Sequence, residues 1–133
     1  MGRIKSASVL ILFAALPALA LPVSPSERAL LFADCTGRLS ALEAHQWMTN
    51  GIESERTGRQ RNAFADLLDA VLPDAVAHGM PAHMALSRRI HAKAAHAALL
   101  NASKFAGDPD RRTTAAKAAE TYRLACLDLI PGA

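Results

Sequence analysis

The chain has two cysteines, Cys35 and Cys126, and each lies in a stretch whose apolar residues recur every three or four positions. In residues 24–50 this spacing places Phe32 and Cys35 on one face of a helix. Cys126 belongs to a similar set in residues 109–130. Both cysteines are therefore expected on the inner faces of helices, one in the first helix of the domain and one in the last.

Short cap sequences predict where the helices begin and end. Ser24-Pro25 and Asp108-Pro109 each combine a capping side chain with a proline suited to the first helical residue. Asn50-Gly51 suits the left-handed turn that ends a helix. Four helices joined by short connections are predicted, over residues 24–50, 59–78, 81–105 and 109–130.

Residues 51–58 are expected to form a polar connection, and Gly79 is expected to end the second helix. Pro73 lies inside the second helix and is expected to break or kink it, because proline has no N–H and crowds the preceding turn. The first inner face also includes Leu39 and Leu42. The other predicted inner faces are Phe64, Leu67, Leu68, Val71 and Ala75; Leu86, Ile90, Ala94, Ala97 and Leu100; and Ala115, Ala119, Tyr122, Cys126 and Leu129.

Four helices of similar length predict an all-α fold, an up-down-up-down four-helix bundle formed by residues 21–133 as one domain. The first and last helices are then antiparallel neighbours. At 1.5 Å per residue, Cys35 lies about 22 Å from Asn50 and Cys126 about 25 Å from Pro109. The two cysteines are thus at similar heights, and in an oxidising compartment they are expected to form a disulfide. The alternative is two buried free thiols.

Residues 1–20 have the three parts of a cleavable signal peptide. Arg3 and Lys5 precede an apolar run over residues 9–16, and residues 18–20 form a small-x-small cleavage site. The apolar run is too short to span a bilayer comfortably. The mature protein is expected to be periplasmic or secreted, with no transmembrane segment after cleavage. The alternative is a buried N-terminal helix.

The net charge argues against nucleic acid as a partner. Of the 15 Lys and Arg residues, Arg3 and Lys5 lie in the predicted signal peptide, which leaves 13 basic residues against 12 Asp and Glu. A nearly neutral domain lacks the counterion-release driving force of nucleic-acid binding.

The segment Cys-Thr-Gly-Arg-Leu-Ser-Ala at residues 35–41, the following Trp47 and the late Cys126 resemble small exported bacterial helical proteins of unknown function. The resemblance spans the whole mature chain. It implies a helical fold and export, and it implies no activity and no functional residues.

One candidate site is a cluster of soft metal ligands. His78, Met80, His83 and Met84 all lie around the turn between the second and third helices. Imidazole and thioether together suit Cu(I), so this turn is a candidate copper site. The alternative is structural: glycine and proline form the turn, and the methionines fill the gap between the two helices.

A second candidate is an anion-binding site made by Arg59, Arg61, Arg111 and Arg112. These arginines lie near the predicted starts of the second and fourth helices, where free N–H groups also favour a phosphate, a carboxylate or a lipid headgroup. Acidic residues occur in the same segments, and a solvated end of mixed charge is the alternative.

Trp47 is a candidate contact with a partner, because tryptophan is frequent among residues that dominate binding energy. The alternative is that Trp47 caps the core of the bundle. Arg88, Arg89 and Lys93 form a short basic strip on the third helix, which is expected to be a solvated face.

No catalytic motif occurs in the sequence. HExxH, CxxCH and the ExxH pairs of di-iron bundles are absent, and no cofactor is expected. The predicted function is therefore non-enzymatic: an exported helical domain that binds an unknown partner protein or small ligand in the cell envelope. Copper handling and anion binding are the alternatives.

Overall fold

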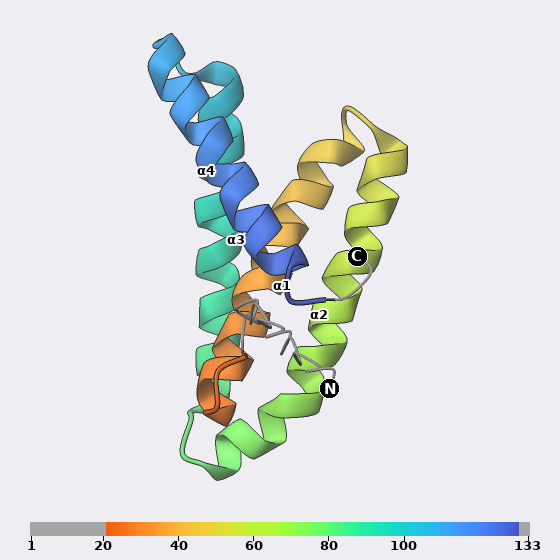
Figure 1. Cartoon of the computed structure of the whole chain (residues 1–133), viewed down its shortest axis with the longest axis vertical. Coiled ribbons are helices and arrows are strands. Elements are labelled where there is room, and N and C mark those ends of the chain that lie inside the picture. The colour runs from red at the N-terminus through yellow and green to blue at the C-terminus, as the bar shows by residue number, and fades with distance from the viewer. Residues whose placement is uncertain (1–20, 131–133) are drawn as a thin grey trace, which may run out of the picture.

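A computed structural model describes residues 21–130, and all regular structure in this part of the chain is helical (Figure 1). The helices are α1 (Pro25–Trp47), α2 (Gly51–Ala77), α3 (Ala82–Phe105) and α4 (Pro109–Leu127). The all-α prediction is confirmed for these residues, whereas the predicted signal peptide lies outside them. None of the four helices is long and apolar enough to cross a membrane.

The caps predicted for α1 and α4 are confirmed. The Ser24 side chain accepts a hydrogen bond from the backbone N–H of Glu27, and Pro25 is the first residue of α1. The Asp108 side chain accepts one from the N–H of Asp110 at 3.1 Å. These side chains satisfy N–H groups that have no partner within their own helix.

The prediction for the segment after α1 was wrong. Asn50 does not end α1, which already stops at Trp47; it caps the start of α2, and its side chain accepts a hydrogen bond from the N–H of Glu53. Residues 51–58, predicted to be a connection, form the first two turns of α2. Polar contacts with α1, described below, hold these turns in place.

α2 continues through Pro73, so of the two predicted outcomes, a break or a kink, the break does not occur. In Figure 1 its last turns change direction toward the start of α3. α2 ends at Ala77, and Gly79, which was predicted to end it, has a φ of 94° two residues later. Glycine adopts this left-handed conformation without the steric cost that a side chain adds.

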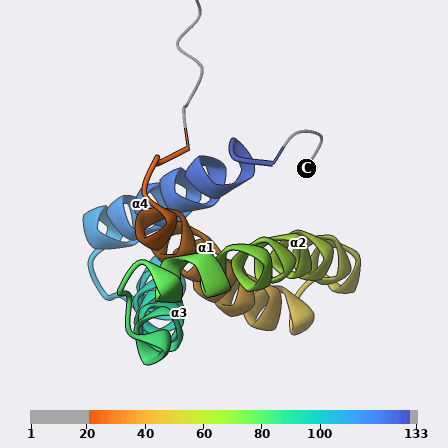
Figure 2. The ribbon, with the colours of Figure 1, turned by 90° about the horizontal axis from the view of Figure 1, so that it is seen from below.

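α1 is the central helix of the arrangement. It packs along both α2 and α3, whereas α2 and α3 hardly contact each other, and α4 packs mainly against α3. Seen from below (Figure 2), α1 lies between the other three helices. The α1–α2 turn and the α3–α4 turn lie at the ends of two separate arms (Figure 1). The up-down-up-down order stays a prediction.

The main core forms where α1 meets α2. Phe32, Cys35 and Leu39 are buried against Phe64 and Leu68, as the predicted inner faces require. The rings of Phe32 and Phe64 have their centroids 6.2 Å apart, a favourable spacing for an aromatic pair. A smaller cluster of Ala41, Leu100 and Ala119 joins α1, α3 and α4.

The inner face predicted for α3 was largely wrong. Leu86 and Ile90 are more than half exposed, and Ala94 is also exposed. Ala97 is partly buried and Leu100 is buried, as predicted, but the buried face otherwise consists of Ala85, Ala92 and His96. α3 lies so close to α1 that small side chains occupy the interface, so the larger apolar residues of α3 point elsewhere.

Most of the predicted inner face of α4 is buried. Ala115, Ala119 and Cys126 are buried, but Tyr122 is partly exposed. The guanidinium carbon of Arg38 lies 3.8 Å from the centroid of the Tyr122 ring. Tyr122 therefore contributes a cation–π contact with α1 rather than a core side chain.

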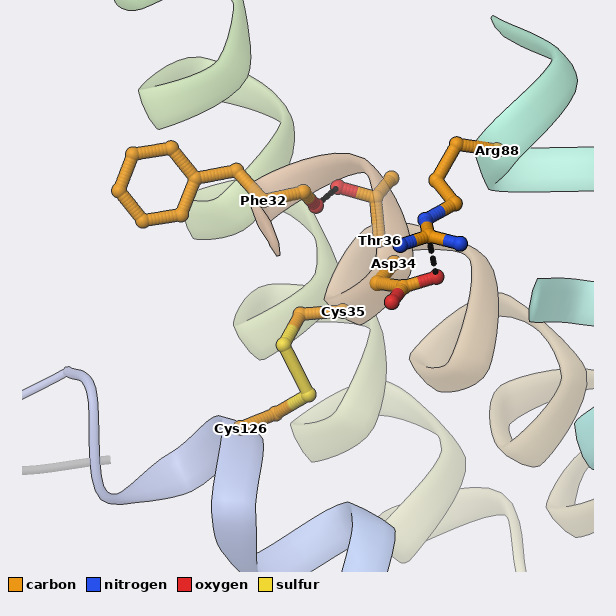
Figure 3. The surroundings of a disulfide bond; sticks show 6 residues. All are labelled: Phe32, Asp34, Cys35, Thr36, Arg88 and Cys126. Atoms are coloured by element: carbon orange, nitrogen blue, oxygen red, sulfur yellow. Dashed lines mark hydrogen bonds and ion pairs between the residues drawn. A yellow bond between two sulfur atoms is a disulfide. The ribbon is translucent and has the colours of Figure 1, made fainter. Parts of the chain in front are cut away.

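The predicted disulfide between Cys35 and Cys126 is confirmed (Figure 3). The two Cα atoms are 5.6 Å apart, both residues are buried, and the bond joins positions 91 residues apart. On the neighbouring face of α1, Asp34 pairs with Arg88 of α3 at 3.5 Å. Covalent and ionic contacts thus fix two helices to this one section of α1.

Candidate functional site

The end of α1 carries an exposed apolar cluster. Trp47, Met48 and Ile52 are 75%, 78% and 81% exposed. These three residues, called the α1–α2 tip below, surround the turn between α1 and α2. Trp47 therefore does not cap the core, which was the structural alternative for this residue. Large apolar side chains exposed so close together in the chain are characteristic of an interaction surface.

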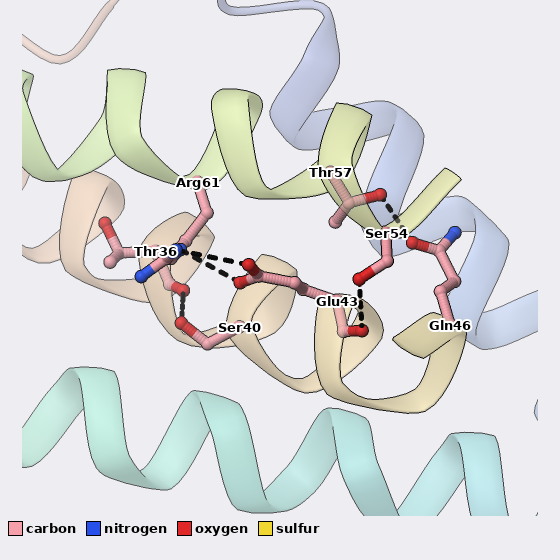
Figure 4. Close-up of polar contacts among 7 residues, drawn as sticks. All are labelled: Thr36, Ser40, Glu43, Gln46, Ser54, Thr57 and Arg61. Atoms are coloured by element: carbon pink, nitrogen blue, oxygen red, sulfur yellow. Dashed lines mark hydrogen bonds and ion pairs between the residues drawn. The ribbon is translucent and has the colours of Figure 1, made fainter. Parts of the chain in front are cut away.

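Hydrogen bonds between α1 and α2 hold this tip in position (Figure 4). The Ser54 hydroxyl donates to the backbone oxygen of Glu43 at 3.1 Å. The Thr57 hydroxyl donates to Oε1 of Gln46 at 2.6 Å. Ser54 and Thr57 are both buried, so these bonds satisfy polar groups that would otherwise destabilise the fold. These two hydrogen bonds thus fix the ends of α1 and α2 that carry the exposed cluster.

A groove of about 330 Å³ adjoins the tip, with α1 as its floor and α2 and α3 as its sides. Ser40 and Ala44 line the floor, and Trp47 lines one end. Arg61 extends from α2 and pairs with Glu43, with Nε 3.0 Å from Oε2 (Figure 4). The lining residues, called the basic groove below, are Ser40, Glu43, Ala44, Trp47, Ser54, Arg61, Arg89 and Lys93.

Apart from the Arg61–Glu43 pair, the charged residues of the basic groove are positive. Arg89 and Lys93 of α3 form no ion pair with any residue of 21–130, whereas the charge of Arg61 is offset by Glu43. The sequence predicted a solvated basic strip on α3, but the structure divides it. Arg88 pairs with Asp34, and the other two cations line the groove.

Gly37 sets the distance between the floor of the groove and α3. A Cβ atom at this position would lie 2.2 Å from the carbonyl oxygen of Arg89 and 3.0 Å from the backbone nitrogen of Lys93. Only glycine permits this approach without a shift of one helix. Gly37 lies within the 35–41 segment, and no pattern in the sequence indicates this role for it.

His96 is a buried titratable residue that no motif or spacing in the sequence singles out. It is almost fully buried between α3 and its neighbours, and its Nδ1 has no hydrogen-bond partner among the described residues. Burial, with a smaller contribution from the positive charge of Arg38, lowers the pKa of His96 from 6.5 to about 4. His96 is therefore neutral at pH 7.

A cavity of about 150 Å³ between α3 and α4 adjoins His96. Glu120 and Arg123 of α4 line it and form an ion pair with each other. The hydrogen bond from Arg123 lowers the pKa of the Glu120 carboxyl. The cavity therefore contains a neutral imidazole and an internally neutralised pair of charges.

The residues proposed for copper lie in different surroundings. Met80 is buried in the main core, which matches the structural alternative, while His83 and Met84 are exposed on the first turn of α3. His78 places Nδ1 3.1 Å from Oδ1 of Asp74. Among residues 21–130, no three His, Cys, Asp or Glu side chains are grouped so as to hold a metal. Copper binding stays a prediction.

The four arginines proposed for anion binding are not gathered in one place. Arg59 and Arg61 lie on α2, and Arg111 and Arg112 lie on α4, whose starts are on separate arms (Figure 1). Arg61 pairs with Glu43, and Arg112 donates to the carbonyl oxygen of Ala106 at 2.7 Å. Anion binding by these residues stays a prediction.

The α1–α2 tip and the basic groove are the surface features with the clearest chemical character in residues 21–130, and they share Trp47. Comparisons with protein-family models, with curated proteins and with solved structures found no match to this chain.

Proposed function

We propose that this chain is an exported, non-enzymatic helical domain that binds a partner protein through the α1–α2 tip. The exposure of Trp47 beside Met48 and Ile52 is the observation that carries the proposal. A tryptophan on a rigid support loses little conformational freedom on binding, and its burial by a partner contributes strongly to affinity.

The location proposed for this function is the periplasm or the extracellular space. The signal-like pattern of residues 1–20 supports export, and the Cys35–Cys126 disulfide fits an oxidising compartment. We propose that the helices form an up-down-up-down bundle in which α1 carries both the disulfide and the binding residue.

Affinity capture from the native cell envelope tests this function. The oxidised protein would be immobilised as bait, alongside a Trp47→Ala variant. Phe105→Ala is the matched control, because Phe105 is equally exposed but lies at the end of α3 on the other arm. We expect the wild type and the control to retain the same partner and Trp47→Ala to lose it.

Two results would contradict the proposal. The first is capture that does not depend on Trp47. The second is a catalytic turnover that a single side-chain substitution abolishes while the fold is retained. If a small ligand is bound instead, envelope extracts freed of protein would still raise the melting temperature of the wild type.

A further inference from the structure

The basic groove is a second surface feature, with its own shape and charge, that partner binding through the tip does not use. α2 and α3 hardly contact each other, so the face of α1 between them is left uncovered. Its floor residues, Ser40 and Ala44, are small. With Arg61 offset by Glu43, Arg89 and Lys93 leave the groove with a net positive charge.

We propose that the basic groove binds an acidic helical segment of the partner protein, with two carboxylates on Arg89 and Lys93 and an apolar side chain against Trp47. This inference rests on the proposed function and specifies the partner's chemistry. A groove between two helices, with a third helix as its floor, is a common receptor for an amphipathic helix.

The spacing of Arg89 and Lys93 defines the spacing of the two carboxylates in the bound helix. Arg89 and Lys93 are four residues apart, and therefore about 6 Å apart along α3. Carboxylates at positions i and i+4 of a bound helix have the same spacing. The small floor residues allow the backbone of such a helix to approach α1, as glycine and alanine do at close helix contacts elsewhere in this fold.

Trp47 fixes the direction in which the acidic segment would extend. It lines the end of the groove that is continuous with Met48 and Ile52 of the tip. An apolar residue placed beyond the two carboxylates would meet this end, so charge and apolar surface are arranged in a defined order. Such an order gives a binding site specificity that charge alone does not.

An anionic membrane is the competing occupant, and the structure favours a protein. The groove has only two cations without an ion-pair partner among the described residues, Arg89 and Lys93, whereas segments that bind anionic lipids carry clusters of about four to eight. The chain outside the predicted signal peptide is almost neutral, with 13 basic and 12 acidic residues. It therefore lacks the surplus of positive charge typical of segments that bind anionic lipids.

Trp47 is the only tryptophan of the chain, so its fluorescence reports on the groove directly. The probe is an alanine-based peptide of about 16 residues, long enough to be partly helical, with Glu at i and i+4 followed by a leucine one turn later. A second peptide carries Gln at both Glu positions. Both are titrated into the oxidised protein at low salt, and binding is followed by the Trp47 emission.

We expect the Glu peptide to change the Trp47 emission and to bind at least five times more tightly than the Gln peptide. Arg89→Gln/Lys93→Gln is expected to weaken the Glu peptide about five- to tenfold, because two exposed ion pairs are lost. Lys104→Gln/Lys117→Gln removes two exposed cations outside the groove, one from α3 and one from α4, and is expected to leave binding unchanged. Circular dichroism checks that both variants are folded.

Equal binding of the two peptides, no binding of either, or no effect of Arg89→Gln/Lys93→Gln overturns the proposal. So does binding to vesicles of phosphatidylglycerol that depends on Arg89 and Lys93 when the Glu peptide does not bind. The groove and the tip are tested separately. If the captured partner requires Trp47 but is retained by Arg89→Gln/Lys93→Gln, the proposed function stands and the acidic-helix inference fails.

Discussion

Substituting Gly37 by alanine is a sharp test of how closely α1 and α3 approach. A Cβ atom at residue 37 would lie 2.2 Å from the carbonyl oxygen of Arg89, whereas real Cβ contacts below 3.0 Å are essentially never seen. The two helices must therefore separate locally by about 0.8 Å or more. The obstacle is backbone rather than the end of a flexible side chain, so no rotamer change relieves it.

Two opposing effects determine how much Gly37→Ala changes the free energy of unfolding. Alanine stabilises a helix by about 1 kcal/mol relative to glycine. Overpacking of a tight interface costs about 1–3 kcal/mol, and the upper end applies here because a whole helix must move. We expect Gly37→Ala to lower the free energy of unfolding by about 2 kcal/mol, which corresponds to a fall in Tm of roughly 8 °C for a domain of this size.

The assay is thermal and urea unfolding followed by circular dichroism without reductant. Gly51→Ala is the control, because Gly51 is also helical but a Cβ there has no neighbour within 4 Å. We expect this control to be neutral or slightly stabilising. If Gly37→Ala instead stabilises the protein by about 1 kcal/mol, as helix propensity alone requires, the close approach of α1 and α3 is refuted.

Three further perturbations have defined outcomes. Replacing Cys35 and Cys126 together by alanine should lower the free energy of unfolding by about 4–5 kcal/mol in the chain-entropy model, since the loop spans 91 residues; urea unfolding measures this, and an unchanged midpoint contradicts it. His96 takes up its proton near pH 6.5 when unfolded but near pH 4 when folded, so stability should fall by at most about 3 kcal/mol as the pH drops through this window. His96→Leu should reduce that dependence of Tm on pH, and a slope identical to wild type would exclude His96 as its source. Asn50→Ala should cost about 1 kcal/mol through the lost cap of α2, measured by urea unfolding against Asn62→Ala, an exposed position within the same helix.

Features encoded by local residue patterns were predictable from the sequence. The caps at Ser24 and Asp108 depend on side chains that bond within three residues of themselves. The apolar residues around Cys35 are large and regularly spaced, so they identify the buried face of α1. Because Cys126 occupies the equivalent position in α4, the pairing of the two cysteines could be predicted as well.

Features that depend on tertiary contacts could not be predicted in this way. Residues 51–58 are too polar to show a helical apolar pattern, and their helix is supported by Ser54 and Thr57 bonding to α1. On α3 the alanines rather than Leu86 and Ile90 are buried, because Gly37 allows a contact too close for large side chains.

The candidate site was only partly predictable for the same reason. Trp47 could be proposed as a binding residue from its type, but its exposure depends on where α1 stops. Arg61 and the cations of α3 come from different helices, and no spacing in the sequence brings them to one groove.

The disulfide also changes what a protease can accomplish. Every turn between the four helices lies between Cys35 and Cys126, within the covalently closed part of the chain. One cleavage at any of these turns therefore yields a nicked protein whose two pieces migrate together until a reductant separates them. A cut beside the α1–α2 tip would leave Trp47 at a new chain end while α1 stayed covalently attached to α4.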